Sequence, residues 1–351
     1  MRVSVLIPAY NAERYVAAAC QSLVNQTEAC FEAIIVDDCS TDHTVQIVQQ
    51  ICEADDRFKL ICLPRNGGPG AARNVAIAAA TARWVALLDA DDTFEPTRLE
   101  HLLNLAERTN ADIVSDNLVL CAEDGVEPER IMYTAERLPR EMLLTAAEYV
   151  VQNTQSIHGS RTSFGFMQPM LRRAFLVRTG IRYDPHSRFG EDFIFSTRCL
   201  IAGASWWVTP AALYRYVVRA GSLTENVNPD DLRAVSEMER DLLADKHRLH
   251  DAALSVALRR HKRTIDHWRY TKAFQTAMRA QNFSGAIRVA FENRDSVQAV
   301  LRDIVANAPV VSFIVRRLVA ARSARMLKKS FKAPVADIKQ SLRQLKPGGV
   351  I

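Results

Sequence analysis

Short apolar runs alternate with amphipathic stretches along the first half of the chain. The runs are rich in Val, Ile and Leu, which favours buried β-strands, and they fall at Val3–Ile7, Ala33–Val36, Leu60–Leu63, Trp84–Leu88 and Ile113–Val114. The spacing of apolar residues between them predicts helices at 12–24, 43–53, 70–80 and after Pro96. This alternation indicates an α/β fold with a mostly parallel central sheet and flanking helices.

The pattern changes near residue 228. Residues 122–164 are polar and irregular, with one expected helix at 141–152, whereas 231–305 shows helical periodicity throughout. Asn228-Pro229-Asp230 is a boundary signal between the two. We therefore divide the chain into an α/β domain, 1–228, and a basic, mainly helical C-terminal region, 229–351.

Polar residues gather where the predicted strands end, which is the edge at which open parallel sheets bind ligands. They are Pro8-Ala9-Tyr10-Asn11, Asp37-Asp38, the Gly-rich turn from Asn66 to Gly70 with Arg73, and Asp89-Ala90-Asp91-Asp92. A ring can stack on a base, a carboxylate can accept from a base or ribose, and a glycine turn before a helix can hold phosphate. Together these ends predict a nucleotide site.

The acidic cluster Asp89, Asp91 and Asp92 follows directly on a hydrophobic strand. Burying three carboxylates without partners is costly, and Mg²⁺ or Mn²⁺ takes such oxygen ligands while sharing a substrate phosphate. Taken alone, the cluster fits a solvated acidic turn equally well.

The Gly-rich turn departs from G-x-G-x-x-G and follows the third strand, which argues against a Rossmann dinucleotide site.

Composition adds limits. Apolar residues make up 48% and charged residues 24% of the chain, ordinary values for a soluble globular protein, and no run approaches the ~20 apolar residues of a membrane span. Seven scattered cysteines without a C-x-x-C predict reduced, buried thiols in a cytosolic protein.

Charge is distributed unevenly. Residues 1–229 carry 21 Lys and Arg against 28 Asp and Glu, and residues 230–351 carry 24 against 12. The segment 310–332 interleaves Val, Ile, Leu and Phe with seven basic residues and no acid, so it suits an anionic membrane surface or a basic helix docked on its own domain. No nucleic-acid recognition motif accompanies it, and nucleic acid is not an expected partner.

Four motifs in chain order carry a family resemblance. V-S-V-L-I-P-A-Y-N, I-I-V-D-D-C-S-T-D, N-G-G-P-G-A-A-R-N and L-L-D-A-D-D, followed by Glu191-Asp192 in F-G-E-D-F, resemble the family 2 glycosyltransferases of GT-A fold. The third motif is most similar to bacterial exopolysaccharide transferases of the succinoglycan type. The resemblance implies a metal-dependent, inverting transfer of a sugar from a nucleotide-sugar donor, UDP-linked, to a growing saccharide linked to polyprenyl diphosphate.

The resemblance also implies a role for each motif residue. The nucleotide-binding residues are Pro8, Ala9, Tyr10, Asn11, Asp38, Gly67, Arg73 and Asp91. The metal-binding residues are Asp92, Asp91 and Asp89, with Asp92 the principal ligand and Asp89 serving the ribose or an outer contact. Asp192 matches the general base and Glu191 a residue that orients the acceptor. Arg215 and Arg219 are both candidates to approach the diphosphate.

The chemistry needs these residue types independently of the resemblance. A cation neutralises charge on a departing diphosphate, and a carboxylate on the opposite face takes the proton of the acceptor hydroxyl. The alternative for Asp192 is an ordinary carboxylate at a helix N-terminus. Rival functions are a non-catalytic sugar-nucleotide-binding or scaffold protein and, more weakly, a glycoside hydrolase with two carboxylates.

Two expectations about place and mode follow. The chain has no Q-x-x-R-W of processive synthases, which favours one sugar per encounter. A lipid-linked acceptor implies a cytoplasmic protein with peripheral contact at the cytoplasmic face of the inner membrane, through 310–332.

Overall fold

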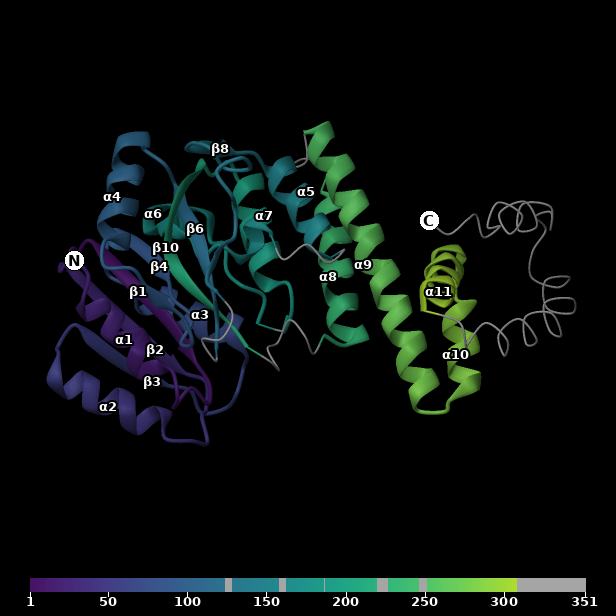
Figure 1. The fold of residues 1–351 in the computed structure, drawn as a ribbon, viewed down its shortest axis with the longest axis horizontal. Coiled ribbons are helices and arrows are strands. Elements are labelled where there is room, and N and C mark those ends of the chain that lie inside the picture. Colours follow the sequence, from purple (N-terminus) through teal and green to yellow (C-terminus); the bar gives the residue numbers. More distant parts are fainter. Residues whose placement is uncertain (124–127, 158–161, 186, 220–226, 246–250, 308–351) are drawn as a thin grey trace, which may run out of the picture.

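One mixed sheet organises the first two thirds of the molecule (Figure 1). Our computed structural model describes residues 1–123, 128–157, 162–185, 187–219, 227–245 and 251–307. The described residues form a ten-stranded sheet. Eight of its strands lie side by side in the order β3-β2-β1-β4-β9-β6-β10-β5, and the other two, β7 and β8, pair with β6 and β10 respectively. The strands span β1 Val3–Ala9, β2 Phe31–Asp37, β3 Phe58–Cys62, β4 Trp84–Leu87, β5 Thr93–Phe94, β6 Ile113–Ala122, β7 Arg130–Ile131, β8 Met142–Leu144, β9 Met170–Arg172 and β10 Trp206–Val218.

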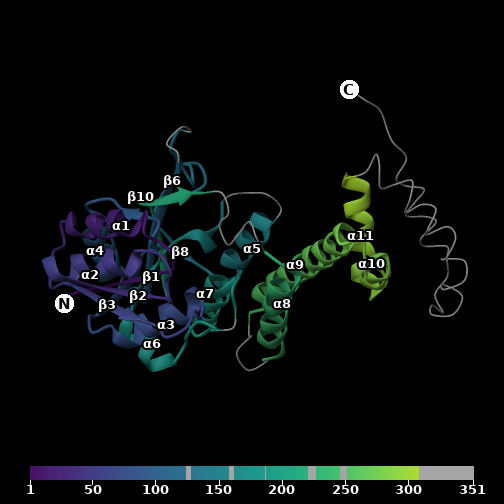
Figure 2. The ribbon, with the colours of Figure 1, turned by 90° about the horizontal axis from the view of Figure 1, so that it is seen from below.

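Helices cover both faces of this sheet. Figure 2 shows α1 and α2 on one face and α3 with α6 on the other, and α5 and α7 stand beside the β10 half. The helices of this part span α1 Val16–Val24, α2 Thr44–Ala54, α3 Pro69–Ala79, α4 Arg98–Thr109, α5 Ala146–Ile157, α6 Arg173–Thr179 and α7 Glu191–Ile201, and a 3₁₀ turn, η1, spans Phe164–Phe166.

The parallel part of the sheet is the one that the apolar runs predict. β1 lies between β2 and β4, parallel to both, and β2 is parallel to β3. Every residue of β2 is buried, and so are all but one of β1, because helices cover both sides. Parallel strands bring their carboxyl ends to one edge, so Tyr10, Asp38 and Asp89 come together there.

The other half is mixed. β9 runs antiparallel between β4 and β6, while β6 and β10 are parallel with register shifts near Ala212. β10 is the longest strand and also pairs with β5 just beyond the acidic cluster. The second half of β10 therefore lies next to the acidic cluster, at the edge where the strands β1, β2 and β4 end.

Two expectations about elements need correction. The helix expected at 141–152 begins at Ala146, because Met142–Leu144 pairs with Trp206–Val208 as β8. Thr145 and Glu148 then form reciprocal side-chain-to-backbone hydrogen bonds that start the helix, a capping box. The helix expected from residue 12 begins only at Val16, since residues 13–15 form a turn before it.

The cysteines differ in exposure. All seven lie among the described residues and are free thiols, with Cys20 and Cys199 buried. The expectation of uniformly buried thiols is wrong for Cys30 and Cys62, which are exposed. Cys62 ends β3, the edge strand of the sheet, so no neighbouring strand covers its outer side.

Helices follow the sheet domain, as the periodicity predicts: α8 Pro229–Ala244, α9 Ala252–Arg279, α10 Phe283–Ala290 and α11 Arg294–Asn307. Their apolar residues divide between two cores. Leu232, Val235 and Leu258 belong to the main core, whereas Phe274 and Ala286 belong to a separate small one. α9 thus begins against the sheet domain and carries α10 and α11 at its far end (Figure 2).

The division at residue 228 stays a prediction, and the main core extends beyond it. The segment 310–332 lies outside the described residues. Within the part of the chain that is described, none of the helices has the length and apolar character of a membrane span.

Candidate active site

The ends of β1 and β2 are joined by polar contacts around Asn11. Its backbone lies in the left-handed region, with φ 49°, its N–H donates to Ser40 Oγ at 2.9 Å, and its Oδ1 accepts from Thr41 N at 2.8 Å. Tyr10, one residue earlier, is 52% exposed. The two loops therefore form a fixed platform that leaves one large aromatic ring open to a ligand.

Asp38 fixes the Gly-rich turn. Its two carboxylate oxygens accept from the backbone N–H groups of Gly67 and Gly68, both at 2.7 Å. A Cβ on Gly67 would lie 2.9 Å from that of Ala71, and Gly68 has φ 81°, so both positions favour glycine. Asp38 is buried, and the structure places it beneath the turn that opens α3.

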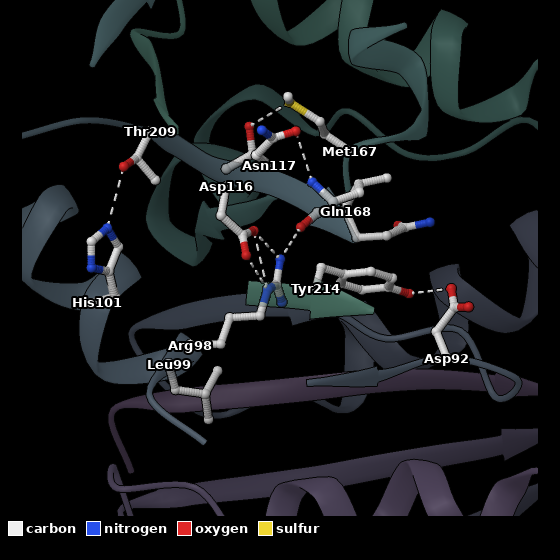
Figure 3. A network of polar contacts seen from close by, with 12 residues as sticks. Asp92, Arg98, Leu99, His101, Asp116, Asn117, Met167, Gln168, Thr209 and Tyr214 are labelled. Carbon is white, nitrogen blue, oxygen red and sulfur yellow. Dashed lines mark hydrogen bonds and ion pairs between the residues drawn. The ribbon is translucent and has the colours of Figure 1, made fainter. Parts of the chain in front are cut away.

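The acidic cluster lies between β4 and β5 and its carboxylates point to different partners. Asp92 is buried and accepts from the Tyr214 hydroxyl at 2.6 Å (Figure 3) and from Val217 N at 2.7 Å. Asp91 pairs with Arg219, with 2.8 Å between Oδ2 and Nε. Burial and the neighbouring carboxylates raise the pKa of both Asp91 and Asp92 above the ordinary range.

Arg73 connects this cluster to the second acidic motif. Its guanidinium donates to Asp89 at 2.8 Å, to Asp192 at 3.1 Å and to Glu191 at 3.2 Å. The side chain is buried, and one cation faces three carboxylates. The structure thus joins residues that lie 119 positions apart. With one arginine against three carboxylates, the formal charge of this group is negative.

Asp192 is the most exposed of the three carboxylates around Arg73, although it is still partly buried. Its side chain is 31% exposed against 11% for Glu191, and it lies in the first turn of α7 after Gly190. Partial burial raises the pKa of Asp192 to about 7; the charge of Arg73 lowers this pKa, while the charges of Glu191 and Asp89 raise it. A carboxylate with this pKa exchanges a proton near neutral pH, as a general base must.

Sequence reasoning missed the residues that support the cluster from behind. Gln168 donates from Nε2 to Asp89 at 2.8 Å, and its backbone carbonyl accepts from Arg98 at 2.6 Å (Figure 3). Arg98 is paired in turn with Asp116, and both are fully buried. No spacing singles out Gln168. Tyr214 and Tyr216 alternate along β10, a pattern in the sequence that indicates a strand with one aromatic face.

The two candidate arginines, Arg215 on β10 and Arg219 just after its end, have different surroundings. Arg215 pairs with Glu95 at 3.0 Å and with Glu129. Arg219 pairs with Asp91, and its guanidinium lies 5.4 Å from the centre of the Tyr15 ring. Arg219 is therefore the one of the pair that lies at the acidic edge.

A divalent cation fits the acidic edge if the protein supplies one or two carboxylates and the substrate supplies the other ligands. In the described part of the chain no group of three or more His, Cys, Asp or Glu side chains is placed to hold a metal alone. Mg²⁺ is commonly held by one or two carboxylates together with substrate phosphates and water. Asp91, a hard oxygen donor that is 23% exposed beside other carboxylates, suits such a shared site.

Comparison with known proteins now identifies the family. Residues 4–175 match the family model described as glycosyl transferase family 2. The chain is 33% identical over 292 residues to the succinoglycan biosynthesis protein ExoO of Rhizobium meliloti, covering 82% of this chain and 80% of that protein. The chain belongs to glycosyltransferase family 2. The family assigned from the sequence motifs is therefore confirmed, and the protein is a glycosyltransferase.

Two further similarities agree. Succinoglycan biosynthesis protein ExoU of the same organism is 32% identical over 307 residues, 87% of each chain. The crystal structure of S. aureus TarS 1–349 in complex with UDP-GlcNAc matches with a TM-score of 0.59 at 21% identity, over 83% of this chain and 92% of that one. At this identity the match concerns the fold, and it confirms the GT-A fold of this family 2 glycosyltransferase.

Proposed function

We propose that the protein moves one sugar per encounter from a nucleotide-sugar donor, UDP-linked, to a growing saccharide in bacterial polysaccharide synthesis. The contact of Arg73 with both Asp89 and Asp192 carries this proposal, because it sets a partly exposed carboxylate beside the acidic cluster. The names of ExoO and ExoU, which are succinoglycan biosynthesis proteins, support the polysaccharide role. The UDP-GlcNAc complex of TarS supports the donor class.

The donor nucleotide would lie at the ends of β1 and β2. The exposed Tyr10 ring offers a face for the nucleotide base, with Pro8 and Ala9 at the end of β1 and Asn11 in the fixed loop that follows. Asp38 would contact the nucleotide base and would also hold the shape of the Gly67 turn through its hydrogen bond. Arg73, which the resemblance put beside the nucleotide, would link the donor side to Asp192, the proposed general base.

The diphosphate would lie over the acidic edge, next to Asp91 and Arg219. A divalent cation held by Asp92 and Asp91, with Asp89 serving the ribose or an outer contact, would neutralise charge on the leaving diphosphate. Asp92 keeps free lone pairs beyond its two hydrogen bonds, since a carboxylate accepts at about four positions. Arg219 adds a fixed positive charge on the same side.

The proton of the acceptor hydroxyl would pass to Asp192 as the sugar is transferred. Its pKa of about 7 leaves a large deprotonated fraction at neutral pH while keeping it basic. Attack from the side of Asp192 would invert the anomeric centre in a single displacement. Glu191, more buried and bound to Arg73, would orient the acceptor or hold the arginine.

The test is release of nucleoside diphosphate from a panel of donors, UDP-glucose, UDP-galactose and UDP-GlcNAc among them, with Mn²⁺ and with EDTA. The proposal predicts turnover of one donor, loss of turnover with EDTA, and loss of turnover in Asp92→Ala. Nucleotide binding without turnover of any donor, in the presence of a bacterial lipid-linked saccharide extract, would instead support a non-catalytic binding protein.

We also propose that the acceptor is linked to polyprenyl diphosphate, and that the protein works at the cytoplasmic face of the inner membrane. The basic segment 310–332 supports this through its composition. Flotation with anionic liposomes tests it: protein truncated after residue 305 should float less than the full chain. Equal flotation would exclude the segment as the anchor.

A further inference from the structure

The turn that presents Glu191 and Asp192 is covered from outside by the C-terminal helices. α8 packs against α7, and α9 packs against both α5 and α8. The residues on either side of the two acids, Phe189, Gly190 and Phe193, each meet a side chain of α8 or α9. None of the acid side chains takes part, so these contacts act on the backbone that carries them.

Two aromatic contacts come from α9. The Phe193 ring stacks on His261, with centroids 4.2 Å apart and planes 16° apart. The Phe189 ring meets Trp268 edge to face, with centroids 5.7 Å apart and planes at 81°. His261 and Trp268 are seven positions apart, about two helical turns, so one face of α9 reaches both ends of the turn.

The third contact comes from α8 and leaves no spare room. Gly190 caps α7 with φ 71°, and a Cβ at this position would lie 2.8 Å from Val235 Cγ2. Val235 itself is buried in the main core. The turn therefore adopts a left-handed conformation directly beneath α8, where only glycine fits.

His261 is itself held in place. Its Nδ1 lies 2.7 Å from Glu239 Oε1, and both side chains are buried. Tyr149 of α5 stacks on Phe193 as well, with planes 9° apart. The Phe193 ring is thus in contact with aromatic rings from two helices, and neither contact requires a ligand.

We propose that His261 and Trp268 are positioning residues that hold the turn 189–193, and with it the Asp192 carboxylate, against the donor side. In naming Asp192 as the base, this inference rests on the proposed function. It gives α8 and the first part of α9 a part in turnover rather than in stability alone. A displacement of about 1 Å of a catalytic group can lower the rate roughly 100-fold, so a loosened turn should be visible in kcat.

The experiment uses full-length Trp268→Ala and His261→Gln; the glutamine can still donate to Glu239 but has no ring. Trp268→Phe is the rescue variant, and Phe274→Ala is the control, because Phe274 is an aromatic residue of α9 in the separate small core. The first readout is hydrogen–deuterium exchange of amides 190–195 without ligand. We expect faster exchange in both test variants and wild-type exchange in Phe274→Ala and Trp268→Phe.

The second readout is kcat for UDP release with the donor that wild type uses, beside the Kd for UDP from calorimetry. We expect kcat to fall at least about tenfold in the test variants with Kd for UDP unchanged, and to recover in Trp268→Phe. Unchanged exchange in both test variants would overturn the inference, and so would an equal fall of kcat in Phe274→Ala. Full turnover in Asp192→Asn would refute the base assignment alone, since the exchange data do not depend on turnover.

Discussion

At the scale of single residues, Arg73 connects two acidic motifs that are separate in the sequence, the one at Asp89 and the one at Asp192. It stands 16 positions from Asp89 and 119 from Asp192, and its planar fork reaches both. The sequence predicted each of the three as a site residue because each belongs to a motif at a strand or helix end. Their direct contact could not be predicted, since it depends on how α3, β4 and α7 pack.

Glu191 should control the pH dependence of the reaction. Its charge raises the pKa of Asp192, so Glu191→Gln should lower that pKa from about 7. Because the base works deprotonated, the acid limb of kcat/KM should move to lower pH. The pH profile measures this, with Glu95→Gln, which pairs with Arg215, as the control variant. An acid limb that stays in place or moves to higher pH would contradict the assignment.

Tyr214 should matter for stability through its hydroxyl. The hydroxyl donates to buried Asp92 and accepts from Asp89 N at 3.2 Å. Tyr214→Phe should therefore lower the free energy of unfolding by about 1–3 kcal/mol, measured by urea denaturation. Tyr133→Phe is the matched control, because the buried Tyr133 hydroxyl has no hydrogen-bond partner in the part of the chain described. Equal losses in the two variants would show that the hydroxyl contact adds nothing.

At the scale of elements, the apolar runs predicted the parallel strands β1 to β4 and the start of β6, because burial on both faces leaves a strong signal. The strands β5, β7, β8, β9 and the long β10 were not predicted, and β8 and β9 show why. Each has three residues, and each forms because a longer strand offers it an edge, β10 for β8 and β4 with β6 for β9. Such pairing is decided by tertiary contact, and no local pattern records it.

Glu32 shows what a single acid can do inside a strand of this sheet. It is buried in β2 and accepts from Ser4, from Thr81 and from Lys59. Burial alone would raise its pKa, but these hydrogen bonds outweigh burial and lower the pKa to about 2. The folded value lies below the unfolded one, so the stabilisation is complete above about pH 4.5 and is lost as pH falls towards 2.

Glu32→Gln should remove this dependence. Between about pH 5 and pH 2 the wild type should lose roughly 2–3 kcal/mol more unfolding free energy than the variant, as measured by denaturation at a series of pH values. At pH 7 the variant should be the less stable of the two. Parallel stability profiles across this range would exclude Glu32 as a source of acid sensitivity.

At the scale of the whole molecule, the basic C-terminal region, 229–351, shares its core with the sheet domain. The sequence indicated its helices and its charge, 24 Lys and Arg against 12 Asp and Glu. It did not indicate that Leu232, Val235 and Leu258 would share the main core, because helical periodicity gives a buried face without naming its partner. The core therefore extends further along the chain than the change in composition suggests.

Truncation should reveal where the cooperative unit ends. A chain of residues 1–228 exposes the apolar surface that α8 and α9 cover, and it should aggregate or unfold without a sharp transition. A chain of residues 1–281 keeps those helices and loses only α10, α11 and the segment after them, so it should retain a cooperative thermal transition. Calorimetry of both measures this. Cooperative unfolding of 1–228 at the full-length temperature would contradict a shared core.

The most direct test of the mechanism is Asp192→Asn in the full-length protein. The variant keeps the size of the side chain and removes the base. Because general base catalysis contributes about 10²–10⁴-fold, kcat for UDP release in the presence of acceptor should fall by that factor, while the Kd for UDP stays at the wild-type value. Full transfer activity in Asp192→Asn would contradict the assignment of Asp192 as the base.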